Sequence, residues 1–158
     1  MIRLRISKLD DNHLYRLIIQ QLLPLAKIGR PLLVMDRKTI FENLNKCKVL
    51  VIARQGRPLF GFISVQVLSR VQVLSSVEVQ PRILKIEMFA IEQTSQGKGW
   101  GSLLMDKAES YGRRKGCEAA LVWVDEQNEA AQAFYVKKGY EIEQYSPEIH
   151  CFLLSKSL

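Results

Sequence analysis

Cysteine and histidine are both scarce in this chain of 158 residues. The three cysteines, Cys47, Cys117 and Cys151, are odd in number and show no CxxC spacing, so the sequence predicts neither a disulfide framework nor a cysteine metal site. The two histidines, His13 and His150, have no zinc-ligand spacing. We therefore expect no metal and a reducing compartment, which makes the cytoplasm the expected location.

Long apolar runs are absent as well. The most apolar stretch, residues 17–26, is interrupted by two glutamines and a proline and is far shorter than the roughly twenty residues of a membrane-spanning helix. Residues 1–6 alternate between apolar and basic residues, as a strand does, and lack the unbroken apolar segment of a targeting peptide. Because 47% of the residues are hydrophobic, we expect a soluble protein with a single domain over residues 1–158.

Acidic residues are few in the first third of the chain. Residues 1–58 hold twelve Lys and Arg against four Asp and Glu, a net charge of +8, whereas residues 59–158 hold eleven against twelve, a net charge of −1. Such an excess suits nucleic acid, membrane headgroups, an acidic small substrate or simply a solvated basic face. Since the sequence shows no interleaving of aromatic and basic residues and no nucleic-acid motif, neither nucleic acid nor a membrane is an expected partner.

The most informative stretch contains three glycines within five residues, Gly97, Gly99 and Gly101. The β-branched run of residues 83–91 before it predicts a strand, and apolar residues at helical spacing from Trp100 onward predict a helix. Glycines at a helix entrance let main-chain N–H groups form a concavity, to which the helix N-terminus adds about half a positive charge. The sequence thus predicts an anion-binding loop, with a plain tight turn as the alternative. The spacing fits neither the nucleotide P-loop nor the dinucleotide-binding glycine pattern.

Periodicity and turn residues predict the elements that come before this loop. We expect a strand at residues 2–6, a helix capped by Asp10–Asn12 and a second helix capped by Asp36. Residues 25–35, between the two helices, predict a long loop, which is either a lid over an acceptor pocket or a packed connection.

Strands and helices alternate along the rest of the chain. Expected strands cover residues 48–54, 59–69, 84–91 and 119–124, with a turn or strand ends at 71–81, a helix that stops at Gly116 and a closing hairpin over 140–154. A strand, helix, strand order predicts a right-handed crossover, and therefore a parallel pair with the glycine loop at the carboxyl end of its strand.

A second motif covers residues 128–140. Asn128 can cap an alanine-rich helix that Gly139 can end, and Tyr135, seven residues after Asn128, points to the same side of it. The pattern Ala-x-x-Phe-Tyr-x-x-x-Gly-Tyr found here, together with Gln-x-x-Gly-x-Gly at residues 96–101, resembles the signatures of the GNAT superfamily of N-acetyltransferases. The resemblance is close over residues 83–145 and rests on element order alone before them.

The resemblance implies a fold, a co-substrate and a set of contacts. The implied fold is a mixed α/β fold with a mostly antiparallel central sheet, one parallel pair at the cofactor site and about four flanking helices. The implied reaction transfers an acetyl group from acetyl-CoA to a primary amine of an unidentified acceptor, by direct attack in a ternary complex. The implied cofactor contacts are the main chain of Phe89, Ala90 and Ile91 and the loop residues Gln96, Gly97, Lys98, Gly99, Trp100, Gly101 and Ser102, together with Asn128 and Tyr135.

Two side chains are expected to be catalytic. An alkylammonium group with a pKa near 10.4 is neutral in only about one molecule in 10³ to 10⁴ at pH 7, so a base or water relay must remove its proton. Glu87, on the strand that leads into the glycine loop, is the expected base, with an ordinary strand glutamate, or one paired with Lys85, as the alternative. By the resemblance, Tyr135 protonates the leaving thiolate, with a core aromatic as the alternative.

Trp100 departs from the family pattern, because a smaller aliphatic residue is common at this loop position. It either packs beneath the loop or covers the cofactor.

Other function classes stay open at this point. A non-catalytic sensor would bind acyl-CoA without transferring the acyl group, and a nucleic-acid-binding module would use the basic first third. The net charge of +8 over residues 1–58 favours an acceptor that carries a negative charge beside its amine. The expected partners are therefore acetyl-CoA and an amine acceptor, with a homodimer left open.

Overall fold

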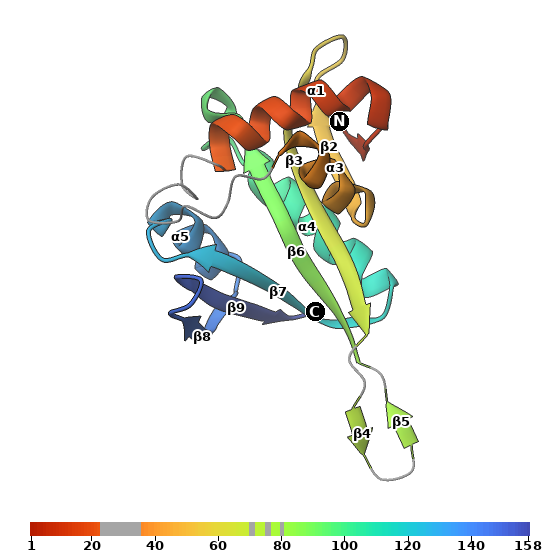
Figure 1. Ribbon diagram of the computed structural model, residues 1–158, viewed down its shortest axis with the longest axis vertical. Coiled ribbons are helices and arrows are strands. Elements are labelled where there is room, and N and C mark those ends of the chain that lie inside the picture. Colours follow the sequence, from red (N-terminus) through yellow and green to blue (C-terminus); the bar gives the residue numbers. More distant parts are fainter. Residues whose placement is uncertain (23–35, 70–71, 75–76, 80) are drawn as a thin grey trace. The chain divides into compact units, whose positions relative to one another are not determined.

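The computed structural model describes residues 1–22, 36–69, 72–74, 77–79 and 81–158 (Figure 1). The loop or lid predicted at residues 25–35 lies outside the described residues. Within the described part, no helix is long and apolar enough to span a membrane.

Seven strands form one mixed sheet in the order β1-β2-β3-β6-β7-β9-β8. Their bounds are Ile2–Leu4 (β1), Lys48–Ala53 (β2), Leu59–Ser69 (β3), Arg82–Ile91 (β6), Cys117–Asp125 (β7), Glu141–Ser146 (β8) and Cys151–Ser157 (β9). Strands β6 and β7 pair in parallel, whereas β1 with β2, β7 with β9 and β8 with β9 pair antiparallel. The predicted mixed sheet with a parallel pair and the predicted closing hairpin are therefore confirmed.

The segment where the sequence predicted a turn or strand ends contains a small hairpin. Strands β4 (Gln72–Leu74) and β5 (Val77–Val79) pair antiparallel and form a two-stranded sheet of their own.

Four α-helices are described, in agreement with the number expected. They are α1 (Ser7–Leu17), α3 (Arg37–Asn45), α4 (Trp100–Arg114) and α5 (Glu129–Lys137). Helix α1 continues as a π-helical turn, η1 (Ile18–Leu22), and a 3₁₀ turn, η2 (Gln93–Ser95), precedes the glycine loop. Asp36 caps α3 as predicted, because its Oδ1 accepts a hydrogen bond from the Thr39 N–H at 2.7 Å.

The predicted start of the first helix is wrong. The N-cap residue is Ile6, so Asp10 lies inside α1 and does not precede it. Its carboxylate still accepts the N–H of Ile6, at 2.6 Å, and forms a two-pronged ion pair with Arg3 at 2.7 Å for each contact. Asp10 therefore satisfies a main-chain donor at the helix start from within the first turns, and the helix begins earlier than the position of the acidic residues indicates.

The chain divides into two compact units, and β3, β6 and α4 each run from one unit into the other. The first unit comprises residues 1–64 and 87–106, and the second comprises residues 65–86 and 107–158. The core of the first unit is formed by buried residues of α1, α3, β2, β3 and β6, namely Leu14, Leu17, Ile18, Ile40, Leu44, Val49, Val51, Leu59, Phe62 and Ala90.

Gly61 allows β3 to approach the end of β6 within the first unit. A Cβ atom at Gly61 would lie 2.5 Å from Cδ1 of Ile91 and 3.3 Å from the carbonyl oxygen of Ala90. The Glu92 N–H donates to the carbonyl oxygen of Phe60 at 2.7 Å just beyond this point. The carboxyl end of β6, where the glycine loop begins, is therefore held against β3 by both packing and hydrogen bonding.

The second unit is held partly by a buried charge on α4. Glu109 is only 2% exposed, accepts a hydrogen bond from the Tyr140 hydroxyl at 3.2 Å and pairs with Lys156 Nζ at 2.8 Å. These contacts connect α4 to β9 and to Tyr140, which directly precedes β8. A carboxylate at this depth is stable only because a cation and a hydroxyl group compensate for its lost hydration.

Candidate active site

The glycine loop joins β6 to α4 within the first unit. Gly97 and Gly99 have φ angles of 71° and 81°, in the left-handed region, and a Cβ atom at either would meet no atom within 4 Å. The main-chain conformation therefore requires glycine at both positions, whereas the available space does not. The predicted order of strand, glycine turn and helix is confirmed.

Helix α4 begins with main-chain donors that lack intrahelical acceptors. The first N–H to bond back into the loop is that of Leu103, which donates to the carbonyl oxygen of Gly99 at 3.0 Å. Among the described residues, no main-chain acceptor bonds to the N–H groups of Trp100, Gly101 and Ser102. Free donors and the helix dipole together create a positive potential that suits a phosphate group. The anion-binding geometry is therefore present, and the identity of the anion stays a prediction.

The side chain of Gln96, the first residue of the motif, closes the loop. Its Nε2 donates to the carbonyl oxygen of Ile91 at 2.9 Å and lies 3.4 Å from Oε1 of Gln21 in η1. The main-chain N–H of Gln96 donates to the carbonyl oxygen of Gln93 at 3.2 Å. Lys98 Nζ likewise donates to a loop carbonyl, that of Thr94, at 2.8 Å. Both polar side chains therefore stabilise the shape of the loop.

Trp100, the first residue of α4, packs against β3. Its ring lies edge to face with that of Phe60, with 5.6 Å between the centroids. The guanidinium of Arg54 lies 5.5 Å from the centroid of the same Phe60 ring. The indole nitrogen of Trp100 is buried and has no hydrogen-bond partner within the described chain. The contact with Phe60 places the Trp100 ring against β3, and whether Trp100 packs beneath the loop or covers the cofactor stays open.

The end of β6 carries the other predicted residues of the first unit. Glu87 and Phe89 are partly buried, whereas Ala90 and Ile91 are buried. The Met88 N–H, between Glu87 and Phe89, donates to Oγ of Ser64 on β3 at 3.0 Å. This part of the strand is thus held from the side of β3, and the catalytic role of Glu87 stays a prediction.

Asn128 and Tyr135 belong to the second unit, on α5. Asn128 Oδ1 accepts a hydrogen bond from the Ala131 N–H at 3.1 Å, which confirms the predicted cap and leaves the amide NH₂ as its donor to other groups. Tyr135 is 4% exposed, and its ring packs edge to face on Phe134 and Tyr140 with centroid distances of 5.4 and 5.3 Å. Burial raises the pKa of the Tyr135 phenol well above its usual value, so the phenol is a proton-bearing donor at neutral pH.

One cluster of polar side chains in the second unit was not singled out from the sequence. The carboxylate of Glu126 accepts a hydrogen bond from the Tyr145 hydroxyl and lies 3.2 Å from Nδ1 of His150. His150 has a φ of 50°, the only positive value at a described residue other than glycine. Glu126 follows β7, Tyr145 lies on β8, and His150 lies in the turn between β8 and β9. Only the strand pairing could have revealed the cluster, because no local pattern joins residues so far apart.

Metal-binding chemistry has no site in the described residues. No group of three or more His, Cys, Asp or Glu side chains there is arranged so that it could hold a metal ion.

The family follows from the sequence motifs and the fold together with one comparison. The model of the acetyltransferase (GNAT) family matches residues 18–140, which is most of the chain. The chain belongs to the GNAT family. No curated protein is similar enough to this GNAT protein in sequence to count as a relative.

Several solved structures are similar to this GNAT protein in fold at low sequence identity. A tetramutant of the BH1408 protein from Bacillus halodurans is 21% identical, with a TM-score of 0.76 over 92% of this chain and 96% of that one. Ard1 from Thermoplasma volcanium is 20% identical, with a TM-score of 0.74 over 100% and 97% of the two chains. NAA60 from Arabidopsis thaliana, in complex with acetyl-CoA, is 13% identical, with a TM-score of 0.76 over 100% and 99%. Identities this low establish a common fold and do not identify the acceptor.

Proposed function

We propose that this GNAT protein is an N-acetyltransferase that moves an acetyl group from acetyl-CoA to a primary amine. The observation that carries the proposal is the set of main-chain N–H groups at the start of α4 that have no acceptor in the described chain, behind a loop whose shape needs Gly97 and Gly99. Membership of an acetyltransferase family and the acetyl-CoA complex of the structurally similar NAA60 support it.

Acetyl-CoA would be held mainly by the main chain. The N–H groups from Gly97 to Ser102 would bind the pyrophosphate, and the main chain of residues 89–91 would bind the pantetheine arm and polarise the thioester carbonyl. The free amide NH₂ of Asn128 would donate to the pantetheine. We assign Gln96 to loop closure, because its N–H and its Nε2 both already have acceptors.

The reaction requires the acceptor nitrogen to lose a proton as its bond to the acetyl carbon forms and the carbon–sulfur bond breaks. Glu87 would take that proton, directly or through water. Tyr135 would donate a hydrogen bond to the departing thiolate. Because burial raises the pKa of Tyr135 far above that of a thiol, complete proton transfer from the phenol would be uphill. We therefore propose that Tyr135 stabilises the thiolate as a hydrogen-bond donor.

Two measurements on the whole chain test this function. Calorimetric titration with coenzyme A and acetyl-CoA should give a binding heat and an affinity, and an assay for free thiol should detect turnover with at least one member of an amine panel. The panel should include amino acids, polyamines, aminoglycosides and peptides, with anionic examples of each class. The absence of coenzyme A binding would refute the proposal. Binding without thiol release from any amine would instead identify an acyl-CoA sensor.

A further inference from the structure

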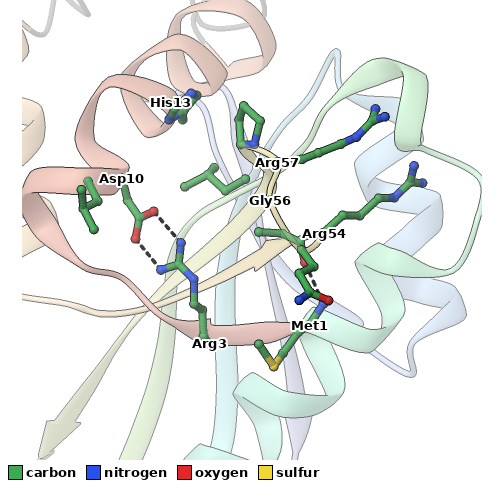
Figure 2. Close-up of a pocket in the computed structure, with 12 residues that line it drawn as sticks. Met1, Arg3, Asp10, His13, Arg54, Gly56 and Arg57 are labelled. Carbon is green, nitrogen blue, oxygen red and sulfur yellow. Dashed lines mark hydrogen bonds and ion pairs between the residues drawn. The ribbon is translucent and has the colours of Figure 1, made fainter.

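A large cavity in the first unit lies between the start of β1, helix α1 and the turn that joins β2 to β3 (Figure 2). Its volume is about 1060 Å³. Four basic side chains line it, those of Arg3, His13, Arg54 and Arg57, together with one acidic side chain, that of Asp10. The cavity is thus rich in positive charge, in keeping with the net charge of the first third of the chain.

The three arginines of the cavity divide into one that is paired with Asp10 and two that are not. Arg3 and Asp10 form two short contacts, of 2.7 Å each, and this pairing holds the pKa of Asp10 below its usual range. Neither Arg54 nor Arg57 forms an ion pair with any carboxylate of the described chain. The terminal ammonium of Met1 also lines the cavity, and it donates a hydrogen bond to the carbonyl oxygen of Ala53 at 2.7 Å. Arg54 and Arg57 are therefore the two arginines of the cavity that have no carboxylate partner in the described chain.

The turn between β2 and β3 places Arg54 and Arg57 together. The Arg57 N–H donates to the carbonyl oxygen of Arg54 at 3.1 Å, and Gly56 between them has a φ of 68°, which suits a tight turn. In Figure 2 both side chains extend from the turn in the same direction, away from the Arg3–Asp10 pair. Two like charges on one turn are unfavourable in isolation, and a multivalent anion between them would relieve the repulsion.

Arg54 also connects the cavity to the glycine loop. Its guanidinium lies over the Phe60 ring, and that ring contacts Trp100 at the start of α4. A cation of the cavity and the first residue of the helix that carries the free N–H groups therefore pack on the same aromatic side chain.

We propose that this cavity binds a phosphate monoester, with Arg54 and Arg57 as the anion-binding side chains. A phosphate monoester carries a charge near −2 at neutral pH, which matches two guanidinium groups, and each planar fork can bind two of its oxygens. The apolar walls of the cavity, including Leu9, Pro58 and Leu59, would contact the organic part of the ligand. The phosphate has two sources, the 3′-phosphate of coenzyme A or a separate phosphorylated ligand. The first source rests on the proposed function, and the second does not.

Titrations with a sugar phosphate test the anion site independently of coenzyme A. The probes are ribose 5-phosphate and, as its neutral counterpart, ribose, both at constant ionic strength. The unmodified chain should bind ribose 5-phosphate and not ribose, and Arg54→Gln combined with Arg57→Gln should weaken that binding by about tenfold or more. Arg57→Gln alone keeps the contact of Arg54 with Phe60 and should weaken binding in the same direction. Arg114→Gln, which removes an exposed arginine near the end of α4, should leave binding unchanged.

Titrations with coenzyme A and with dephospho-coenzyme A, which lacks the 3′-phosphate, identify the source. If the source is the cofactor, the unmodified chain should prefer coenzyme A by about tenfold, and the double variant should lose the preference while keeping its affinity for dephospho-coenzyme A. An equal affinity for both forms, combined with arginine-dependent binding of ribose 5-phosphate, would assign the cavity to a separate phosphorylated ligand. The proposal is overturned if neither the sugar phosphate nor the 3′-phosphate gains affinity from Arg54 and Arg57. Loss of all coenzyme A binding would refute the proposed function alone, because the sugar phosphate titration would still stand.

Discussion

The glycine loop and helix α5 carry the proposed site residues of the two units in different ways. The loop offers main-chain N–H groups, and its side chains serve to shape it, as Gln96 and Lys98 show. Helix α5 offers a side chain, because Tyr135 is buried among aromatic rings with its phenol protonated. Substitutions should therefore act on the loop through conformation and on α5 through the chemistry of a single group. Three variants test this distinction, from the largest expected effect to the smallest.

Removal of the Tyr135 hydroxyl should have the largest effect. Tyr135→Phe keeps the ring and its packing, and it should lower kcat by about 10- to 100-fold, because the thiolate would lose a charged hydrogen bond of roughly 1.5–3 kcal/mol. The affinity for coenzyme A, measured by calorimetry, should change little. Tyr140→Phe is the matched control, since its ring packs on the same cluster while its hydroxyl bonds to Glu109. The control should lower the unfolding free energy and leave kcat unchanged. If Tyr135→Phe leaves kcat unchanged, the Tyr135 hydroxyl has no role in the reaction.

A change of main-chain conformation in the loop should act on affinity. Gly99→Ala places a Cβ atom at a φ of 81°, which costs about 1–2 kcal/mol and favours rearrangement of the loop. We expect the dissociation constant of coenzyme A to rise about tenfold in calorimetric titrations. Gly116→Ala makes the same change beyond the other end of α4, at a φ of 74°, with equally open surroundings. It should lower thermal stability and keep the affinity. If Gly99→Ala and Gly116→Ala bind coenzyme A with equal affinity, the conformation of the loop does not control binding.

The smallest effect is expected from the side chain that closes the loop. Gln96→Leu removes the hydrogen bond to the carbonyl oxygen of Ile91, worth about 1 kcal/mol, and should raise the dissociation constant of coenzyme A by about fivefold at most. Gln93→Leu is a control on the adjacent turn, where the side chain is exposed. A larger loss of coenzyme A affinity for Gln96→Leu than for Gly99→Ala would show that the Gln96 side chain contacts the ligand. The main chain of the loop would then not be its only binding group.

Local patterns were enough to predict the parts of the structure in which residues act on near neighbours. The caps at Asp36 and Asn128 were predicted because each side chain bonds to an N–H group three residues further on. The strand, glycine turn and helix followed from the glycine spacing in the same way. The parallel pairing of β6 and β7 followed from element order and the handedness of crossovers.

Contacts between distant residues were not predicted. Asp10 lies inside α1 and pairs with Arg3 on β1, and the spacing of acidic residues reveals neither fact. The Glu126, Tyr145 and His150 cluster depends on how β8 and β9 pair beside the loop after β7. The cavity lined by Arg54 and Arg57 is formed by three segments that are separate in the sequence, namely the start of β1, helix α1 and the turn between β2 and β3. The excess of positive charge over residues 1–58 is evident from composition, but composition does not show where the charges lie.

The packing of Trp100 beside the glycine loop also provides an optical signal. The chain contains only two tryptophans, Trp100 and Trp123. A Trp123→Phe variant would leave a single indole, partly buried at the start of α4, as the source of tryptophan fluorescence. Its emission wavelength and intensity would then report on occupancy of the loop without any added label.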